Sequence, residues 1–293
     1  MMAVNYATQY SKALANAYPY SLYTGKLWTT ENSSKYNIVD AKTIQIPLVS
    51  VTGRTDGNRD KIDGFKQNHS NSYETKTLGH HRSWETFIHP KDISETNKVL
   101  SIQNITQTMN ETQKFPEMDA YIISTLYALK NAKETIVQET ADLTAASILA
   151  KFDKLMDEMD EALVPPSGRL LYVDTYTKTM IDNAISIVRS NGDKTIARAI
   201  NRIEEVEILS MPTTLLKTEY DFTVGWVPKS TAKSIAMMLV HPSVILPIVS
   251  YEFALLGEPS TLSKGKYTYF EESFEDVFIL NEKHNALKFV VKK

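Results

Sequence analysis

Residues 51–84 read VTGRTDGNRDKIDGFKQNHSNSYETKTLGHHRSW, and this polar stretch decides how the rest of the chain is interpreted. After Val51, its sizeable apolar side chains before Trp84 are Ile62, Phe65, Tyr73 and Leu78. Such a composition offers too little apolar surface to form a core of its own. Long loops without regular structure are uncommon inside compact domains and are usually functional or disordered. We therefore expect an arm that reaches another molecule.

Strand patterns flank the polar stretch on both sides. Before it, Ile44, Ile46 and Leu48 alternate with Thr, Gln and Pro, which is typical of a half-buried strand at a sheet edge. After it, residues 83–88 (SWETFI) are predicted to be the returning strand. Together these segments predict one long hairpin. Its interleaved bases and acids suit contacts that set the register with a partner subunit, and a solvated hairpin would carry similar charges.

The whole chain has the composition of an ordinary globular protein. Its 293 residues, 42% hydrophobic and 23% charged, suffice for one large domain or two modest ones. The formal net charge of −3 gives no global attraction to nucleic acid or to an anionic membrane. The absence of cysteine excludes disulfides, thiol catalysis and thiolate metal sites. Neither a secretory signal nor a membrane span is predicted, because the most apolar window, 235–256, contains two prolines, a histidine and a glutamate.

Helices and strands alternate through the rest of the chain. Apolar spacing predicts two consecutive helices, or one long kinked helix, over 92–131, opened by a capping box at Asp92 and broken or restarted at Pro116. Further helices are predicted at 144–163 and 175–189, and the predicted strands are 169–173, 204–211, 235–240, 245–253, 267–280 and 286–291. This order predicts a mixed α+β fold.

The first 36 residues are polar but rich in aromatic side chains, including Tyr18 and Trp28. Tyr and Trp give a large contact area at low entropic cost, so a polar arm that carries them is expected to lie on a surface. That surface is either the chain's own domain or a partner, and the sequence leaves both open.

No pattern in the sequence predicts catalysis. Dinucleotide-binding, P-loop and nucleophile-elbow motifs are absent. His80 and His81 are neighbours next to a predicted strand, where adjacent side chains point to opposite faces and chelate a metal poorly. The acids of 153–161 are predicted to form a solvated helix face, and those of 271–276 to be surface or interface charge. We therefore expect no catalytic residue, no metal, no cofactor and no enzymatic activity.

Five segments, taken in order, resemble one known family. They are AVNYATQYS (3–11), PEMDAYIISTLYAL (116–129), VPPSGRLLYVDTYTKTMI (164–181), VHPSVILPIVSYE (240–252) and DVFILNEKHNALKFVV (276–291). As an ordered set they resemble the major capsid proteins of tailed bacteriophages with the HK-97 fold, as in phages of Gram-positive bacteria. The resemblance covers nearly the whole chain.

The resemblance implies an α+β, HK-97-like capsid fold in five parts. These are an N-terminal arm (1–36), an extended β-hairpin loop (37–90), a peripheral domain with a long spine helix (91–135), a central axial α/β domain (136–233) and C-terminal strands shared between the peripheral and axial domains (234–293).

The implied function is that of a major capsid protein that self-assembles into the hexamers and pentamers of an icosahedral phage head around double-stranded DNA. The implied partners are copies of this chain, a separate scaffolding protein, a portal protein and packaged DNA contacted non-specifically, but no membrane. The procapsid would assemble in the host bacterial cytoplasm, and the chain would end in the virion. The loop and the arm would form the assembly interface through Tyr18, Trp28, Arg54, Arg59, Lys61, Phe65, Lys66 and Trp84.

Three other functions stay open on the sequence. An encapsulin-like nanocompartment shell protein has the same fold and encloses an enzyme cargo in place of DNA. A soluble α/β hydrolase would use the acidic helix or the histidines. Another virion or tail component would assemble as rings or tubes.

Overall fold

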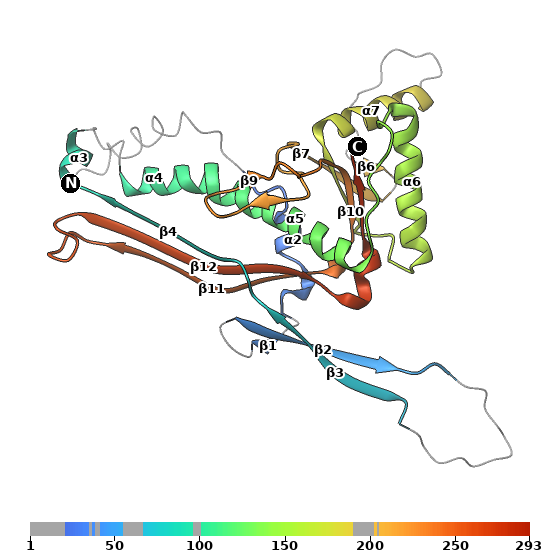
Figure 1. Cartoon of the computed structure of the whole chain (residues 1–293), viewed down its shortest axis with the longest axis horizontal. Helices are drawn as coiled ribbons and strands as arrows, with labels where there is room; N and C mark the ends of the chain where they lie inside the picture. The colour runs from blue at the N-terminus through green and yellow to red at the C-terminus, as the bar shows by residue number, and fades with distance from the viewer. Residues whose placement is uncertain are drawn as a thin grey trace.

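The computed structural model describes residues 21–34, 37–38, 42–54, 67–95, 101–189, 202–203 and 205–293. These residues form an elongated molecule with three parts (Figure 1). A body of one sheet and several helices lies at one end. A long three-stranded sheet with a helix beside it extends from the body in one direction, and a two-stranded hairpin extends in another.

The body is built on a mixed sheet with the strand order β13-β10-β5-β7-β6. Its strands are β13 (Leu287–Val291), β10 (Ile235–Val240), β5 (Leu170–Asp174), β7 (Val206–Met211) and β6 (Arg202–Ile203). β5 and β7 are parallel, and the connection between them contains α7 (Thr175–Arg189); the other neighbours are antiparallel. Every residue of β5 and β10 is buried, which explains their nearly continuous apolar sequences.

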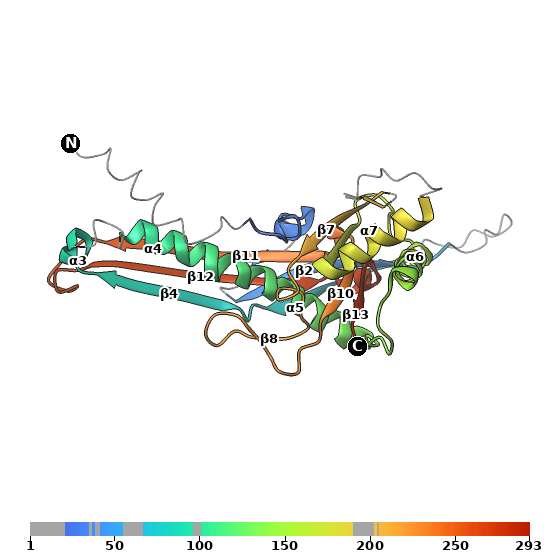
Figure 2. The same cartoon turned by 90° about the horizontal axis from the view of Figure 1, so that it is seen from above.

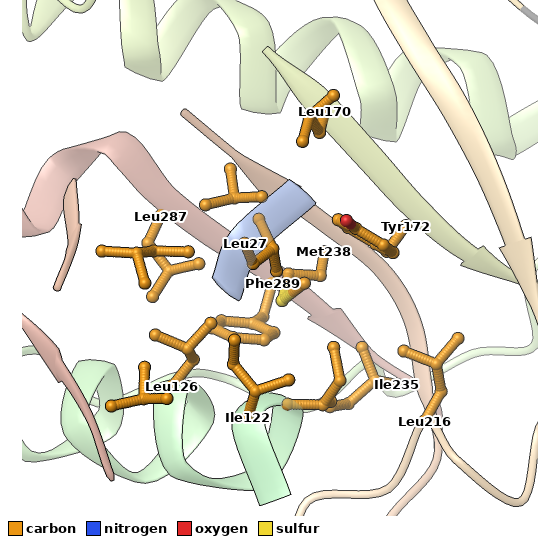
Figure 3. Close-up of a cluster of buried hydrophobic side chains, with 14 of the residues drawn as sticks. Leu27, Ile122, Leu126, Leu170, Tyr172, Leu216, Ile235, Met238, Leu287 and Phe289 are labelled. Atoms are coloured by element: carbon orange, nitrogen blue, oxygen red, sulfur yellow. The ribbon is translucent and has the colours of Figure 1, made fainter. Parts of the chain in front are cut away.

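The two faces of this sheet bury two separate apolar clusters, because successive strand residues point to opposite faces. Leu171 and Val173 pack in one cluster with α7 and with the apolar stripe of α6 (Ala145–Glu161). Leu170 and Tyr172 belong to the other cluster, together with α5 (Phe115–Lys133) and α2 (Gly25–Trp28). Figure 3 shows side chains of this second cluster, among them Ile122 and Leu126 of α5.

A long antiparallel sheet, hereafter the outer sheet, has the strand order β11-β12-β4. β11 (Ile245–Gly257) and β12 (Tyr267–Ile279) each have 13 residues, and β4 is His81–Ile88. The start of β11 and the end of β12 are buried in the body, whereas the far end of β11 is exposed and that of β12 is half-buried. The register shifts between Val249 and Tyr251, which marks a bulge close to where the ribbon leaves the body.

One continuous helix follows the outer sheet in both views (Figures 1 and 2). It consists of α4 (Ile102–Met109), a π-helical turn η3 (Asn110–Lys114) and α5, and it is hereafter the long helix. α3 (Pro90–Glu95) precedes it. Pro116 lies in the first turn of α5, directly after the π-helical turn.

The hairpin pairs β2 (Thr43–Val51) with β3 (His69–Thr77), and β1 (Asn37–Ile38) lies on the other edge of β2. The predicted returning strand at 83–88 is therefore wrong, because Val51 is paired with His69 and Trp84 is paired with Glu271 of β12. The sequence of β3 shows no alternation of apolar residues, because both faces of this strand are exposed or only half-buried. The hairpin is thus shorter than expected, and β4 belongs to the outer sheet.

Short elements complete the fold: η2 (Glu31–Ser34), β8 (Tyr220–Asp221), β9 (Val227–Pro228), η4 (Pro242–Val244) and η5 (Asn281–Ala286). None of the helices in the described ranges is long and apolar enough to cross a membrane.

Most predicted elements are confirmed, including the mixed α+β class. The start of α6 is capped by Thr144, whose side chain accepts a hydrogen bond from the Ser147 amide while Ser147 Oγ accepts one from the Thr144 amide. The helix start at Asp92 is wrong, because α3 begins at Pro90 and α4 begins after its N-cap Ser101.

Candidate assembly surfaces

The base of the hairpin is anchored in the molecule. Ile44, Ile46 and Leu78 form a buried cluster with Leu246, Ile248 and Phe278 at the root of the outer sheet. The Lys76 ammonium lies 2.6 Å from Glu74 and over the ring of Phe278, and Glu74 also accepts a hydrogen bond from Asn281. The hairpin therefore leaves the body in a fixed direction.

The outer half of the hairpin has no such support from the described residues. Val49 is 72% exposed, Val51 is 74% exposed, and Tyr73 on the facing strand is also exposed. Arg54, one of the predicted contact residues, is exposed just beyond β2. A two-stranded hairpin alone in water is only marginally stable, so this half is a surface that gains from a partner.

Five predicted contact residues lie outside the described residues: Tyr18, Arg59, Lys61, Phe65 and Lys66. Their assignment to an assembly interface stays a prediction.

Trp28 packs on its own subunit. It lies on α2, beside Leu27, and contacts the cluster that α5 and the body sheet bury between them. The backbone amides of Tyr23 and Thr24 donate to the buried carboxylate of Asp119 at 3.1 and 2.8 Å. For residues 21–34, the surface on which the arm lies is therefore the chain's own body, whereas residues 1–20 lie outside the described residues and both alternatives stay predictions there.

Further along this segment, Asn32 fixes the chain to the root of the outer sheet. Its Nδ2 donates to the carbonyl oxygens of Ser243 and Ile245 at 2.8 and 3.0 Å. Ser243 lies in η4 and Ile245 is the first residue of β11. Asn32 therefore holds this segment at the point where the outer sheet leaves the body.

Trp84 lies near the middle of β4. Its side chain is half-buried, and its ring centroid is 5.7 Å from that of Tyr269. Apolar side chains remain exposed around the far end of the outer sheet, namely Phe87, Phe253, Leu255 and Leu256. The ammonium of Lys266 covers the Phe87 ring at 4.1 Å. By strand alternation, Phe87, Phe253 and Leu255 share one apolar face of the outer sheet far from the body, and Leu256 lies on the other face with Trp84.

Polar contacts join the outer sheet to the long helix. The Arg82 guanidinium contacts Glu117 through two nitrogens, and its third nitrogen donates to the Phe222 carbonyl at 2.6 Å. The Tyr121 hydroxyl donates to Asp276 at 2.7 Å, and Asp276 also accepts from the Gly79 amide at 2.7 Å. These contacts bring together residues that are distant in sequence.

Burial shifts the titration of three groups at this junction. His80 stacks on Tyr121 with ring centroids 3.7 Å apart, and burial, aided by the Arg82 charge, lowers its pKa to about 4. Burial raises the pKa of Glu117, although Arg82 opposes that shift. Burial also raises the pKa of Glu275 to about 7.

The assignment of the 271–276 acids to surface charge is wrong for two of them, because Glu275 and Asp276 are buried. The apolar run that follows them, VFIL, is the signal in the sequence that the strand enters the core at this point. Polar residues next to such a run need internal partners, and Asp276 has them.

Three of the remaining candidate groups have structural partners. On α6, Asp160 pairs with buried Arg169 at 2.5 Å and Glu158 pairs with Lys288 at 2.8 Å. His81 contacts Glu272 at 2.6 Å. Among the described residues, no cluster of three His, Asp or Glu side chains could hold a metal ion.

No protein-family model matches the sequence, and no curated protein matches it. Solved structures do match the fold. The chain is similar to a structure from Mycobacterium phage Che8 with a TM-score of 0.62 and 11% identity, over 94% of this chain and 91% of the other. It is similar to a chain of the mature capsid of bacteriophage PhiM1 with a TM-score of 0.60 and 13% identity, over 86% and 82%.

A virus-like particle from Pyrococcus furiosus is also similar, with a TM-score of 0.50 and 8% identity, over 98% of this chain and 96% of the other. At these identities the likeness shows the fold. The HK-97-like capsid fold implied by the sequence resemblance is thereby confirmed.

Proposed function

We propose that this chain is a major capsid protein that self-assembles into the hexamers and pentamers of an icosahedral phage head around double-stranded DNA. One observation carries the proposal beyond the shared fold. Two ribbons leave the body, and both expose apolar side chains at their far ends, Val49 and Val51 on the hairpin and Leu255 and Leu256 on the outer sheet. Projecting strands of this kind gain their burial from neighbours.

The role of the predicted contact residues follows from this arrangement. The hairpin, with Arg54, Arg59, Lys61, Phe65 and Lys66, would lie on a neighbouring copy, where its charges set the register and its apolar side chains supply burial. Trp84 would act through the face of the outer sheet on which its side chain lies. Trp28 would hold the arm on its own body, while Tyr18 contacts a neighbour.

The domain division proposed for this function keeps the boundaries expected from the resemblance. These are the arm (1–36), the extended loop (37–90), the peripheral domain with the spine helix (91–135), the axial domain (136–233) and the shared C-terminal strands (234–293). Within the second part, β4 would act with the peripheral domain, since it pairs with β12.

The proposed partners are copies of the chain, a separate scaffolding protein, a portal protein and packaged DNA contacted without sequence specificity. Assembly would take place in the host bacterial cytoplasm, with the virion as the final location. The proposal gives the chain a structural role and no catalytic one.

A nanocompartment shell is the second candidate, since the virus-like particle from Pyrococcus furiosus has a similar fold. Its TM-score is lower than that of the phage capsid chain, 0.50 against 0.60. We therefore rank the phage head first.

Electron microscopy of the purified full-length chain, alone and with a co-expressed scaffolding protein, tests the proposal. We expect closed icosahedral particles whose yield rises with the scaffold. Tubes would favour a tail component, and discrete monomers at all concentrations would contradict a shell. Particles that form only around an enzyme encoded by a neighbouring gene would favour the nanocompartment.

A further inference from the structure

The long helix and the outer sheet enclose a cleft of about 740 Å³. One wall is the π-helical turn η3 with Met109 and Glu117 on either side, the other is the face of β4, β12 and β11, and residues 223–225 close one side. This volume lies within the range of pockets that take a small molecule or a few residues of a peptide.

Negative charge dominates the lining of the cleft. Five glutamate residues line it, Glu117, Glu252, Glu271, Glu272 and Glu275, of which Glu272 is paired with His81 at 2.6 Å, and its permanent cations are Arg82 and Lys114. Arg82 is taken up by Glu117 and by the Phe222 carbonyl. Lys114 reaches Glu271 and Glu252 only at 3.5 and 3.8 Å, which is too long for strong hydrogen bonds.

Glu275 is the group that an acidic surface alone does not explain. Its residue is 7% exposed and lines the cleft, and its carboxylate makes no hydrogen bond or ion pair with any described residue. Its backbone amide donates to the His80 carbonyl, which holds the residue in place. Burial raises its pKa to about 7, with Glu117 and Glu252 adding to the shift and Lys114 and Arg82 opposing it.

An acceptor without a partner also lies in the wall of the cleft. The side-chain oxygen of Asn110, on η3, is buried without a hydrogen-bond partner among the described residues, and Asn110 lines the cleft. Buried acceptors without partners are rare and point to a missing donor. A ligand that carries several N–H donors and a positive charge would satisfy Glu275.

We propose that this cleft binds an organic cation, an alkylammonium or guanidinium group, whose N–H donors bond to Glu275 and to the surrounding carboxylates. The cation belongs either to a free polyamine or to a Lys or Arg side chain of a protein. Binding ionises Glu275, and the released proton passes to the solvent.

Calorimetry on the full-length protein at pH 7 tests this site with three probes. The first is the peptide acetyl-Gly-Arg-Gly-amide, the second is the same peptide with neutral citrulline in place of arginine, and the third is putrescine. We expect the citrulline peptide to bind roughly tenfold more weakly than the arginine peptide, because it matches the shape without the charge. The tighter of the two cationic probes identifies the source of the cation.

Repeating the titration in buffers with different ionisation enthalpies counts the protons that binding releases. Since Glu275 is about half protonated at pH 7, we expect roughly half a proton per bound cation. Release of no proton would overturn the role of Glu275.

Variants locate the site. Glu275→Gln should weaken binding of the arginine peptide roughly tenfold, and Glu252→Gln, an exposed change at the rim, roughly threefold. Glu258→Gln, which removes an exposed carboxylate outside the cleft, is the matched control and should leave affinity unchanged. Equal binding of the arginine and citrulline peptides, or equal affinities of the Glu252 and Glu258 variants, would overturn the proposal even if Glu275→Gln fails to fold.

Discussion

The guanidinium of Arg82 on β4 holds the carboxylate of Glu117 on the long helix at two points, with Nε 2.5 Å from Oε1 and Nη2 3.1 Å from Oε2. The two residues are 35 positions apart and belong to two different elements, β4 and the long helix. A planar, two-point contact fixes orientation as well as distance. This pair therefore sets how the helix lies on the outer sheet.

Replacing Arg82 by Leu should lower the free energy of unfolding of the subunit by about 2–3 kcal/mol, because Glu117 would remain largely buried without its partner. Urea denaturation followed by circular dichroism measures the change. Lys26→Ala is the control, since the Lys26–Glu207 pair is exposed and should contribute less than about 1 kcal/mol. Equal effects of the two variants would contradict the structural role given to Arg82.

Replacing Asp119 by Ala should loosen the segment at Tyr23 and Thr24, while Asn32 keeps its own bonds to the Ser243 and Ile245 carbonyls. This buried carboxylate accepts from the amides of Tyr23 and Thr24 and from the Thr24 hydroxyl, and no other acceptor would replace it. We expect a loss of about 3 kcal/mol and faster hydrogen exchange at those amides, measured by mass spectrometry. Thr24→Val keeps both amide contacts and should have a smaller effect; unchanged exchange in Asp119→Ala would show that the segment is held by other contacts.

Glu275 should make the subunit less stable as the pH rises. Its pKa is about 7 in the folded state and near 4.5 when unfolded, so the folded state binds the proton more tightly, and the stability it contributes below pH 4.5 is lost progressively up to about pH 7. The loss should be at most about 3 kcal/mol. Urea midpoints of the wild type and of Glu275→Gln between pH 5 and 8 measure it, and the variant should show the flatter profile.

His80 acts in the opposite direction in an overlapping range. Its folded pKa of about 4 lies below the usual 6.5, so its contribution is lost as the pH falls from 6.5 toward 4. Because the wild type and the Glu275 variant both keep His80, the difference between their profiles isolates Glu275. Parallel profiles would show that Glu275 titrates normally.

Shortening the hairpin should prevent closed shells without unfolding the subunit. Replacing residues 53–67 by Asn-Gly joins Thr52 to Asn68, whose backbone atoms are already hydrogen-bonded at 2.9 Å, through a two-residue turn that suits a β-hairpin. We expect an unchanged urea midpoint and loss of particles by electron microscopy and sedimentation. Scrambling the same residues keeps length and composition, and distinguishes a need for reach from a need for specific contacts. Intact particles from the shortened chain would contradict the role proposed for the hairpin.

Elements with strong apolar patterns could be predicted from the sequence. The unbroken run IAMMLV gives β10, whose residues are buried on both faces, and the stripe Ile148, Phe152, Leu155 and Met159 gives α6. The alternation in KTIQIPL gives β2. In each case the buried face or faces require apolar residues at a regular spacing, and that spacing is visible in the sequence.

Pairing between distant strands could not be predicted in this way. β3 carries no apolar face, so HSNSYETKT has no pattern that distinguishes a strand from a polar loop. The next apolar alternation along the chain belongs to β4, and for this reason the sequence predicts β4 as the returning strand of the hairpin. β4 pairs instead with β12, about 185 positions away, through backbone hydrogen bonds that local periodicity does not encode. The cleft and its buried Glu275 depend on that pairing, which is why sequence reasoning placed the acid on the surface.

The π-helical turn at 110–114 constrains the length of the chain more than its sequence. An α-helix rotates by roughly 100° per residue, so deleting one residue from this turn would swing α4 around the helix axis relative to α5. Ile122, Ile123 and Leu126 fix α5 to the body, so the part that would rotate is α4, which lies along the outer sheet. Related chains can therefore carry other residues in this turn. A gain or loss of one residue there would instead turn a different face of α4 toward the outer sheet.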